Sequence, residues 1–435
     1  MTSINVNYII LLKISMIFIL IGNLARSISP TFSALFEFFL ISLLLFFSIL
    51  YMAQTKISLS NNELIYYSFI IYLIIHLAFA SIFRPFELEA SFFEIFFYNL
   101  SEFRLSTLGY LLPFIFVPIF YKKTISFELF IITLIKFSIL YTLFEQILSL
   151  SGFRSFFESA YSNSGVVSDN LVGVKSLGMY RVWGLIGSPQ LLGIFHVITL
   201  IYLLDKKETF WSILCIIAII ASTSKSSYFI LLIYGFIFLL QRKYYMTLIF
   251  SLLSLIVISI ITINFYLYLI DMNMTEDYPV FIKFVGSIHG YFLLLTNVAE
   301  ESAARRFILG GSLYEFYIYF SNNPLNILAG KGITYSLYHD TSSMVIADYQ
   351  YLTSDYYILT FVEQYGLIGF LFIFYIFIIY PIIQIFKTDK LYYAIPIIFF
   401  LAMLHYPPNI SKLFMVFMSY SLYKIYLLPK YSHEK

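Results

Sequence analysis

Long apolar runs recur along the whole chain, and they restrict its possible folds more than any other feature. A run of about 20 apolar residues can cross a bilayer as an α-helix, because a helix satisfies every backbone N–H and C=O within itself. The chain is 60% apolar and only 11% charged, whereas soluble domains carry about 25% charged residues. The sequence therefore predicts an all-α polytopic integral membrane protein.

These runs predict twelve transmembrane helices. Short links on one side of the membrane are basic, and the positive-inside rule makes that side cytoplasmic. Because the number of spans is even, both termini are predicted to be cytoplasmic. The predicted spans are 8–25, 32–53, 63–83, 107–121, 126–150, 189–204, 208–223, 226–240, 245–271, 355–380, 391–405 and 411–428. The basic residues of this side are Lys56, Lys122, Lys123, Lys206, Lys207, Arg242, Lys243, Lys387, Lys390, Lys430 and Lys435.

Three longer links lie on the opposite, outer side at 84–106, 151–188 and 272–354. Links between packed elements are usually short, so long ones usually have a function. The chain is thus divided into a bundle of nine spans, 1–271, a large outer loop with short helices, 272–354, and three closing spans, 355–435. The two halves show no internal repeat, although a transporter built from related halves would often show one.

Several classes of site are excluded. The single cysteine, Cys215, lies inside an apolar run, so an intrachain disulfide and a Cys-based metal site are both impossible. No nucleotide-binding motif is present, and the 26 basic and 24 acidic residues nearly balance, so no nucleic-acid role is suggested. The histidines lack metal-ligand spacing, and His76 and His196 are interpreted as hydrogen bonded between helices. We expect no metal and no cofactor.

Two polar turns stand out on the outer side. The first reads GMYRVWGLIGSPQLLG at 178–193 and places Arg181 and Trp183 just outside the sixth span. Trp183 is a candidate for stacking on a sugar ring, and the alternative is an ordinary aromatic residue at the membrane interface. The second turn, STSKSS at 222–227, joins the seventh and eighth spans and carries Lys225.

Cations from separate segments share this outer side: Arg181, Lys225, Arg305, Arg306 and Lys331. The planar guanidinium fork of arginine binds phosphate through two parallel hydrogen bonds, so converging arginines suit a diphosphate. The alternative is that each is a solvated interfacial charge. Because charge is so sparse, we favour diphosphate binding for Arg181 with the Arg305/Arg306 pair. Neighbouring residues on a helix point about 100° apart, so one of the pair is expected to face the site.

Carboxylates near the tenth span are candidates for accepting a proton. Asp355 lies in the first turn of that span, and Glu363 lies one or two turns further in, with Asp340 and Asp348 in the preceding link. An acidic residue inside a span is costly, which favours a function for Glu363. The alternative for Glu363 is a salt bridge to Lys136 in the fifth span. Spacing alone does not rank Asp355 above Glu363.

Three stretches together resemble the O-antigen polymerase (Wzy) family, which belongs to a wider group of bacterial glycan polymerases and O-antigen ligases. They are RVWGLIGSPQLLG within 178–193, the cation-bearing turn STSKSS at 222–227, and ARRF, NPLNILAGKGI and SDYYILTFVEQYGLIG within 303–369. The motifs are a few arginines and glycines in the right order on a background of many spans.

The resemblance implies a polymerase of O-antigen or a related surface polysaccharide in the bacterial inner membrane, with its active face periplasmic. A growing glycan would move from undecaprenyl diphosphate onto a lipid-linked repeat unit. Arg181 and one of Arg305 and Arg306 would hold the diphosphate, whereas Lys225 stands where the family commonly has arginine. A flippase and a chain-length regulator of the same pathway are the implied partners.

Alternative functions are a lipid-linked oligosaccharide flippase or other transporter, an O-antigen ligase, and a structural membrane anchor. The absent repeat and the long outer links disfavour a transporter. Ligases of this group typically carry a histidine before the tenth span, where this chain reads SDYY at 354–357. An anchor would not need its sparse charges gathered on one face. The polymerase is therefore the favoured reading.

Overall fold

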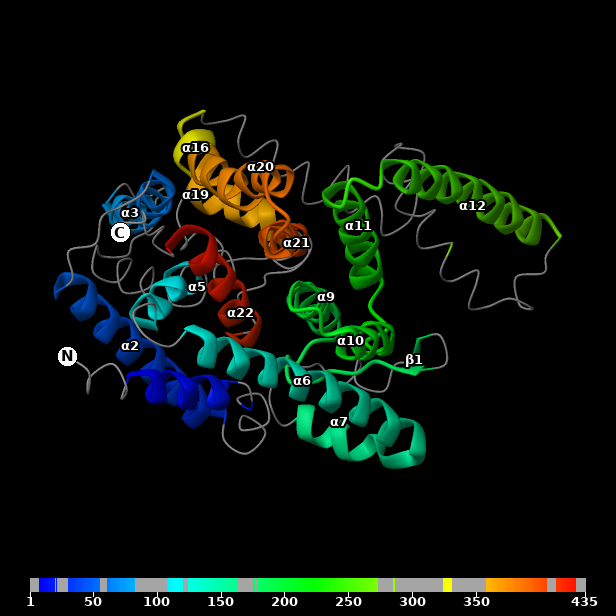
Figure 1. Cartoon of the computed structure of the whole chain (residues 1–435), viewed down its shortest axis with the longest axis horizontal. Helices are drawn as coiled ribbons and strands as arrows, with labels where there is room; N and C mark the ends of the chain where they lie inside the picture. Colours follow the sequence, from blue (N-terminus) through cyan, green and yellow to red (C-terminus); the bar gives the residue numbers. More distant parts are fainter. Residues whose placement is uncertain are drawn as a thin grey trace, which may run out of the picture.

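The computed structural model describes residues 8–19, 21, 30–54, 61–82, 108–119, 124–162, 175–176, 179–272, 285, 324–330, 357–404 and 412–427. Their regular structure is helical apart from one short hairpin, and Figure 1 shows the helices gathered into a bundle. In the hairpin, β1 (Lys175–Ser176) pairs antiparallel with β2 (Met179–Tyr180). The predicted all-α class is therefore confirmed for this part of the chain.

The described helices follow one another in chain order. The first group is Tyr8–Ile19, α2 (Pro30–Gln54), α3 (Asn61–Ile82), α5 (Leu108–Leu111), η1 (Leu112–Ile119), α6 (Thr124–Leu148), η2 (Ser149–Phe153) and α7 (Arg154–Ser162). After the hairpin come α9 (Pro189–Asp205), α10 (Thr209–Ala221), α11 (Lys225–Gln241) and α12 (Tyr245–Asp271). The last group is α16 (Pro324–Ala329), α19 (Tyr357–Phe374), η4 (Tyr375–Ile379), α20 (Tyr380–Lys387), η5 (Leu391–Tyr393), α21 (Ala394–Met403), α22 (Lys412–Leu422) and η7 (Tyr423–Leu427).

Within the described residues, three helical stretches are long and apolar enough to cross a membrane: Phe127–Glu158, Tyr245–Asp271 and Gln364–Lys387. Shorter apolar helices, among them Pro189–Asp205 and Thr209–Ala221, lie at other predicted spans. These findings support a protein that can span a membrane. The full set of twelve spans stays a prediction.

The fifth predicted span does not end at residue 150. Helix α6 passes through the π-helical turn η2 into α7, which ends at Ser162. Gly152 makes this path possible, because its φ of 96° lies in the left-handed region that glycine adopts without steric cost. The predicted outer link at 151–188 therefore begins with helix.

The fourth and tenth predicted spans also differ in detail. Most of the fourth is the 3₁₀ helix η1, which contains Pro118, and proline removes the backbone donor that an α-helix needs. The tenth was predicted as one helix over 355–380, but Gly366 has φ 67° and ψ −175° and breaks α19 there. The membrane-length stretch begins instead near Gln364 and ends at Lys387.

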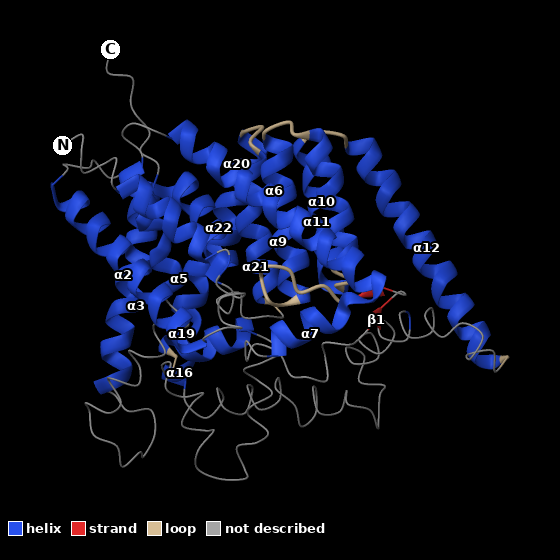
Figure 2. Cartoon of the chain, turned by 90° about the horizontal axis from the view of Figure 1, so that it is seen from below, coloured by secondary structure: helices blue, strands red, loops and turns tan. Residues whose placement is uncertain are grey.

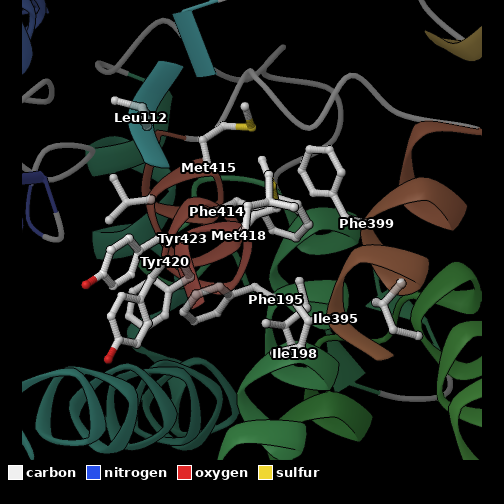
Figure 3. Packing of buried hydrophobic residues seen from close by; sticks show 14 of the residues in the cluster. Leu112, Phe195, Ile198, Ile395, Phe399, Phe414, Met415, Met418, Tyr420 and Tyr423 are labelled. Carbon is white, nitrogen blue, oxygen red and sulfur yellow. The ribbon is translucent and has the colours of Figure 1, made fainter. Parts of the chain in front are cut away.

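Helix α9 is the centre of the bundle. Every residue from Pro189 to Leu203 is buried except Gln190, as expected for a helix surrounded by others on all sides. It contacts α6, α10, α11 and α21. Figure 3 shows Phe195 and Ile198 of α9 packed among side chains of α21 and α22. The rings of Phe195 and Phe417 meet edge to face at 5.0 Å, which fixes how α22 crosses α9.

Three short turns connect α9, α10, α11 and α12 into successive antiparallel hairpins. The residues with positive φ in these turns are Lys207, Thr223 and Lys243. Two of the turns lie at the same end as the link after α20, because Gln241 Nε2 donates to the carbonyls of Thr388 and Lys390 and Asp205 accepts from the backbone of Leu391. Figure 2 shows these turns along one edge and α7, β1 and α16 toward the other. That the first edge is cytoplasmic stays a prediction.

Helix α12 stands apart from the rest of the bundle in Figures 1 and 2. Only Tyr266 and Leu269 are buried within it, and large apolar side chains are exposed along its length. Such an all-round apolar surface suits contact with lipid rather than with water.

A second junction joins α3, α16 and α19. His76 Nε2 is hydrogen bonded to the carbonyl of Ala329, and the Tyr72 hydroxyl donates to the carbonyl of Tyr365. Gly330 and Gly366 meet so closely that a Cβ on either one would overlap the other's backbone nitrogen. Helix α16, which lies within the predicted link 272–354, is thereby held against the break in α19.

Candidate functional site

Two charged residues are buried where α6 ends. Glu145 is 0% exposed and Arg154 is 5% exposed. Arg154 Nη1 lies 3.6 Å from Glu145 Oε1, and its Nε lies 3.5 Å from Glu158 Oε1. On a continuous α-helix, residues nine positions apart would point about 180° apart, at about 100° per residue. The π-helical turn and the break at Gly152 bring the two side chains together.

This pair holds the backbone of the loop that precedes α9. The N–H of Trp183 donates to Glu145 Oε1 at 3.0 Å, and the N–H of Gly184 donates to Oε2 at 2.8 Å. Arg154 Nη2 donates to the carbonyl of Arg181 at 3.1 Å, and its guanidinium lies 5.3 Å from the ring centre of Tyr180. One carboxylate and one guanidinium therefore hold four successive or near-successive positions of the loop.

The Arg181 side chain is not part of this framework. Arg154 holds the carbonyl of Arg181, whereas the Arg181 guanidinium is partly exposed and has no hydrogen bond or ion pair within the described residues. The buried carboxylate of Glu145 is occupied by two loop amides and by Arg154. The loop held by Glu145 and Arg154 thus carries an arginine side chain that is partly exposed.

The N-terminal half of α9 brings this loop and the serine turn together. Gly184 has φ 56° and packs so closely that a Cβ would lie 2.9 Å from Leu192 Cδ2. At the next position, Gly193, a Cβ would lie 2.6 Å from Ser222 Oγ and overlap Ser227 Oγ. The segments that carry Arg181 and Lys225 therefore pack against adjacent residues of one helix, and that this end faces the outer side stays a prediction.

Two helices begin at this place. Ser188 caps α9 by accepting from the N–H of Leu191 (3.5 Å), and Ser224 caps α11 by accepting from the N–H of Ser227 (3.4 Å). The N-terminal end of a helix carries a partial positive charge that favours anions. Lys225 is the first residue of α11. Both helix starts therefore favour an anion at this end of α9.

Trp183 is buried, whereas a ring that stacks on a sugar would need an exposed face. Its ring is 5% exposed and packs against Phe157 of α7, with Tyr141 and Leu148 beside it. A ring buried to this extent offers little face to a sugar, so the geometry favours a packing role for Trp183. The ring then helps to fix the Arg181 loop.

Most of the other predicted site residues fall outside the described part of the chain. Arg305, Arg306, Lys331 and Asp355 lie beyond it, and their predicted roles stay predictions. Glu363 lies in α19 just before the break at Gly366, and only its backbone is described.

The salt bridge suggested as the alternative role of Glu363 is not formed by Lys136. Lys136 Nζ pairs instead with Glu208 Oε1 at 3.1 Å and lies 5.2 Å from the ring centre of Trp211. The side chain of Lys136 is long enough to reach the start of α10 along the surface of α6, which explains why a lysine is tolerated within the fifth span.

Glu145 and Arg154 were missed as candidates from the sequence. Nine residues separate them, so they lack the three- or four-residue spacing of a helical ion pair. The signal that could have identified Glu145 is its position inside a predicted span, the same argument that singled out Glu363.

The buried histidines have the interhelical role that was predicted. His196 Nε2 is 2.9 Å from Thr142 Oγ1 of α6, and the Cys215 thiol of α10 donates to the carbonyl of His196. These contacts tie α6 and α10 to α9. In the part of the chain that the structure covers, no three His, Cys, Asp or Glu residues gather as a metal site.

Comparisons with known proteins add no relative. No family model matches the chain, and no curated protein or solved structure matches it. The interpretation of the site therefore depends on its own residues: a partly exposed arginine on a loop fixed by a buried ion pair, next to two helix N-termini. Such an arrangement can bind an anionic group at the end of the bundle.

Proposed function

We propose that the chain is a bacterial inner-membrane polymerase of O-antigen or a related surface polysaccharide, acting on undecaprenyl-diphosphate-linked substrates. Helices able to cross a membrane support access to a lipid-linked substrate. The observation that carries the proposal is the Arg181 guanidinium, which is partly exposed and without an ion-pair partner among the described residues. The loop that carries Arg181 is held by Glu145 and Arg154 through hydrogen bonds to its backbone.

In the proposed reaction, Arg181 binds the diphosphate of the donor lipid together with one of Arg305 and Arg306. A hydroxyl of the incoming repeat unit attacks the anomeric carbon of the donor glycan, forming the new glycosidic bond. The bond from that carbon to the diphosphate oxygen breaks, and undecaprenyl diphosphate leaves with the electron pair. Fixed guanidinium groups stabilise the charge that develops on this leaving group. The hydroxyl proton passes to a carboxylate, for which Asp355 and Glu363 are the candidates.

The proposal is tested with a strain that lacks this chain. Loss of the polymer with retention of a single repeat unit on the lipid core, seen as the collapse of the glycan ladder on a gel, is the expected result. Complete absence of glycan from the lipid core would indicate a ligase instead. Accumulation of lipid-linked repeat units on the cytoplasmic leaflet would indicate a flippase, and either outcome would overturn the proposal.

Variants then test the assignment of the site in the same strain. Arg181→Ala is expected to give the collapsed ladder at normal protein level. Arg242→Ala is the matched control, because Arg242 is also a cation of a loop region but lies at the other end of α11, over the ring of Phe238. The control should keep the full ladder, and loss of the ladder in both variants would mean that general charge loss is the cause.

A further inference from the structure

We propose that Glu145 and Arg154 are positioning residues that keep Arg181 available to an anionic ligand by neutralising each other. This inference rests on the proposed function, in which Arg181 binds a diphosphate. Glu145 fixes the backbone of the loop through the amides of Trp183 and Gly184. Arg154 in turn occupies the same carboxylate at 3.6 Å.

Arg154 compensates the buried negative charge of Glu145. A fully buried carboxylate is costly unless a cation compensates it. If Arg154 were uncharged, Glu145 would lose its ion-pair partner on the loop side of α6. The side chain of Arg181 begins two residues before the amide that Glu145 already binds, and an arginine side chain is long enough to turn back over that distance. Arg181 would then pair with Glu145 and be lost to the ligand.

This mechanism differs from simple structural support in one measurable way. If the pair only stabilised the fold, Arg154→Met would weaken ligand binding whether or not Arg181 is present, because it leaves Glu145 buried without its compensating cation. If Arg154 protects Arg181 from Glu145, the effect of Arg154→Met requires the Arg181 side chain. Adding Arg154→Met to Arg181→Ala should then cause little further loss of binding, because the two residues act through the same contact and their effects are non-additive.

The experiment measures binding of undecaprenyl diphosphate to the full-length protein in lipid nanodiscs. Arg154→Met keeps the length of the side chain without its charge and is expected to weaken binding by about tenfold or more, the loss of one charge-assisted contact. Glu145→Gln/Arg154→Met should recover part of that loss, because Arg181 is released while the glutamine keeps one acceptor oxygen for the loop amides. Arg154→Met added to Arg181→Ala should bind like Arg181→Ala alone. Glu128→Gln is the matched control on the same helix, since Glu128 pairs with Lys206 and Lys424 at the opposite end of α6. It should bind like the wild type.

A second measurement follows the loop without any ligand. The chain has two tryptophans, so a Trp211→Phe background leaves Trp183 as the reporter of the loop. Buried Trp183 should be protected from acrylamide quenching in that background and with Glu128→Gln. Glu145→Gln replaces one acceptor oxygen by an amide donor, so one of the two loop amides loses its partner and quenching should rise at least about twofold.

The outcomes separate this inference from the proposed function. Two results refute the protection of Arg181: a Glu145→Gln/Arg154→Met variant that binds as weakly as Arg154→Met or more weakly, and a further loss of binding when Arg154→Met is added to Arg181→Ala. Unchanged quenching in Glu145→Gln refutes the holding of the loop. If quenching responds as expected while wild-type protein neither binds undecaprenyl diphosphate nor polymerises glycan, the proposed function fails, and the loop is held for another purpose.

Discussion

Gly193→Ala tests whether the outer end of α9 unites the two cation-bearing segments. A methyl group at this position would overlap Ser227 Oγ and would lie 2.6 Å from both Ser227 Cβ and Ser222 Oγ. A serine hydroxyl can rotate away, but the Cβ of Ser227 is fixed to the backbone of α11. The serine turn and α9 must therefore separate, and the segment carrying Lys225 must move away from the Arg181 loop.

The magnitude follows from two opposing terms. Overpacking a close buried contact costs about 1–3 kcal/mol. Alanine in a helix interior is better than glycine by about 0.8–1 kcal/mol, which offsets part of this cost. We therefore expect a net destabilisation of about 1 kcal/mol, within a range of about 0–2 kcal/mol. Gly235→Ala is the matched control on α11, because a Cβ there meets nothing within 4 Å, and it should be neutral or stabilising by up to about 1 kcal/mol.

The assay is thermal unfolding of the purified proteins in one detergent, followed by circular dichroism at equal concentration and scan rate. Gly193→Ala should unfold at a lower temperature than the wild type, and Gly235→Ala at an equal or higher temperature. Adding Ser227→Gly removes the obstructing Cβ and should recover part of the loss. If Gly193→Ala unfolds together with Gly235→Ala, α9 and the serine turn are not in close contact, and the shared site loses its geometric basis.

Three further predictions concern charge and orientation. Arg181→Ala should weaken undecaprenyl diphosphate binding by about 2 kcal/mol, roughly 30-fold, and Arg181→Lys should recover only part because an ammonium lacks the bidentate fork. Alanine at Arg305 and at Arg306 should have unequal effects on the glycan ladder, and full activity of both variants would remove the pair from the site. Reporter fusions that are active only outside the cytoplasm should be active within 151–188 and 272–354, and silence at both would reverse the orientation.

The helical class and the position of α9 could be predicted from the sequence because they depend on composition and local signals. Apolar runs identify helices wherever they are long enough, and Pro189 marks the first turn of α9 as a proline at that position usually does. Arg181 was placed correctly in the loop before α9 for the same reason. Each of these features depends on residues that are close together in the chain.

The ion pair between Glu145 and Arg154 that supports the site could not be predicted, because it depends on an interruption of the regular helix between them. Gly366 lies inside a predicted span and Gly152 just beyond the end of another, and only the fold shows their positive φ. The break at Gly152 turns Arg154 toward Glu145, which regular helical spacing would have put on the opposite face. A pair created by an irregularity leaves no periodic signal.

The close approach of Gly330 and Gly366 joins two parts of the chain through main-chain atoms alone. Such a joint has no rotatable side chain that could absorb a displacement, so it acts as a mechanical pin between the end of α16 and the bend in α19. We expect a shift of α16 to be transmitted directly to that bend, three residues from Glu363. One added carbon at either glycine would overlap the backbone of the other and force the two segments apart.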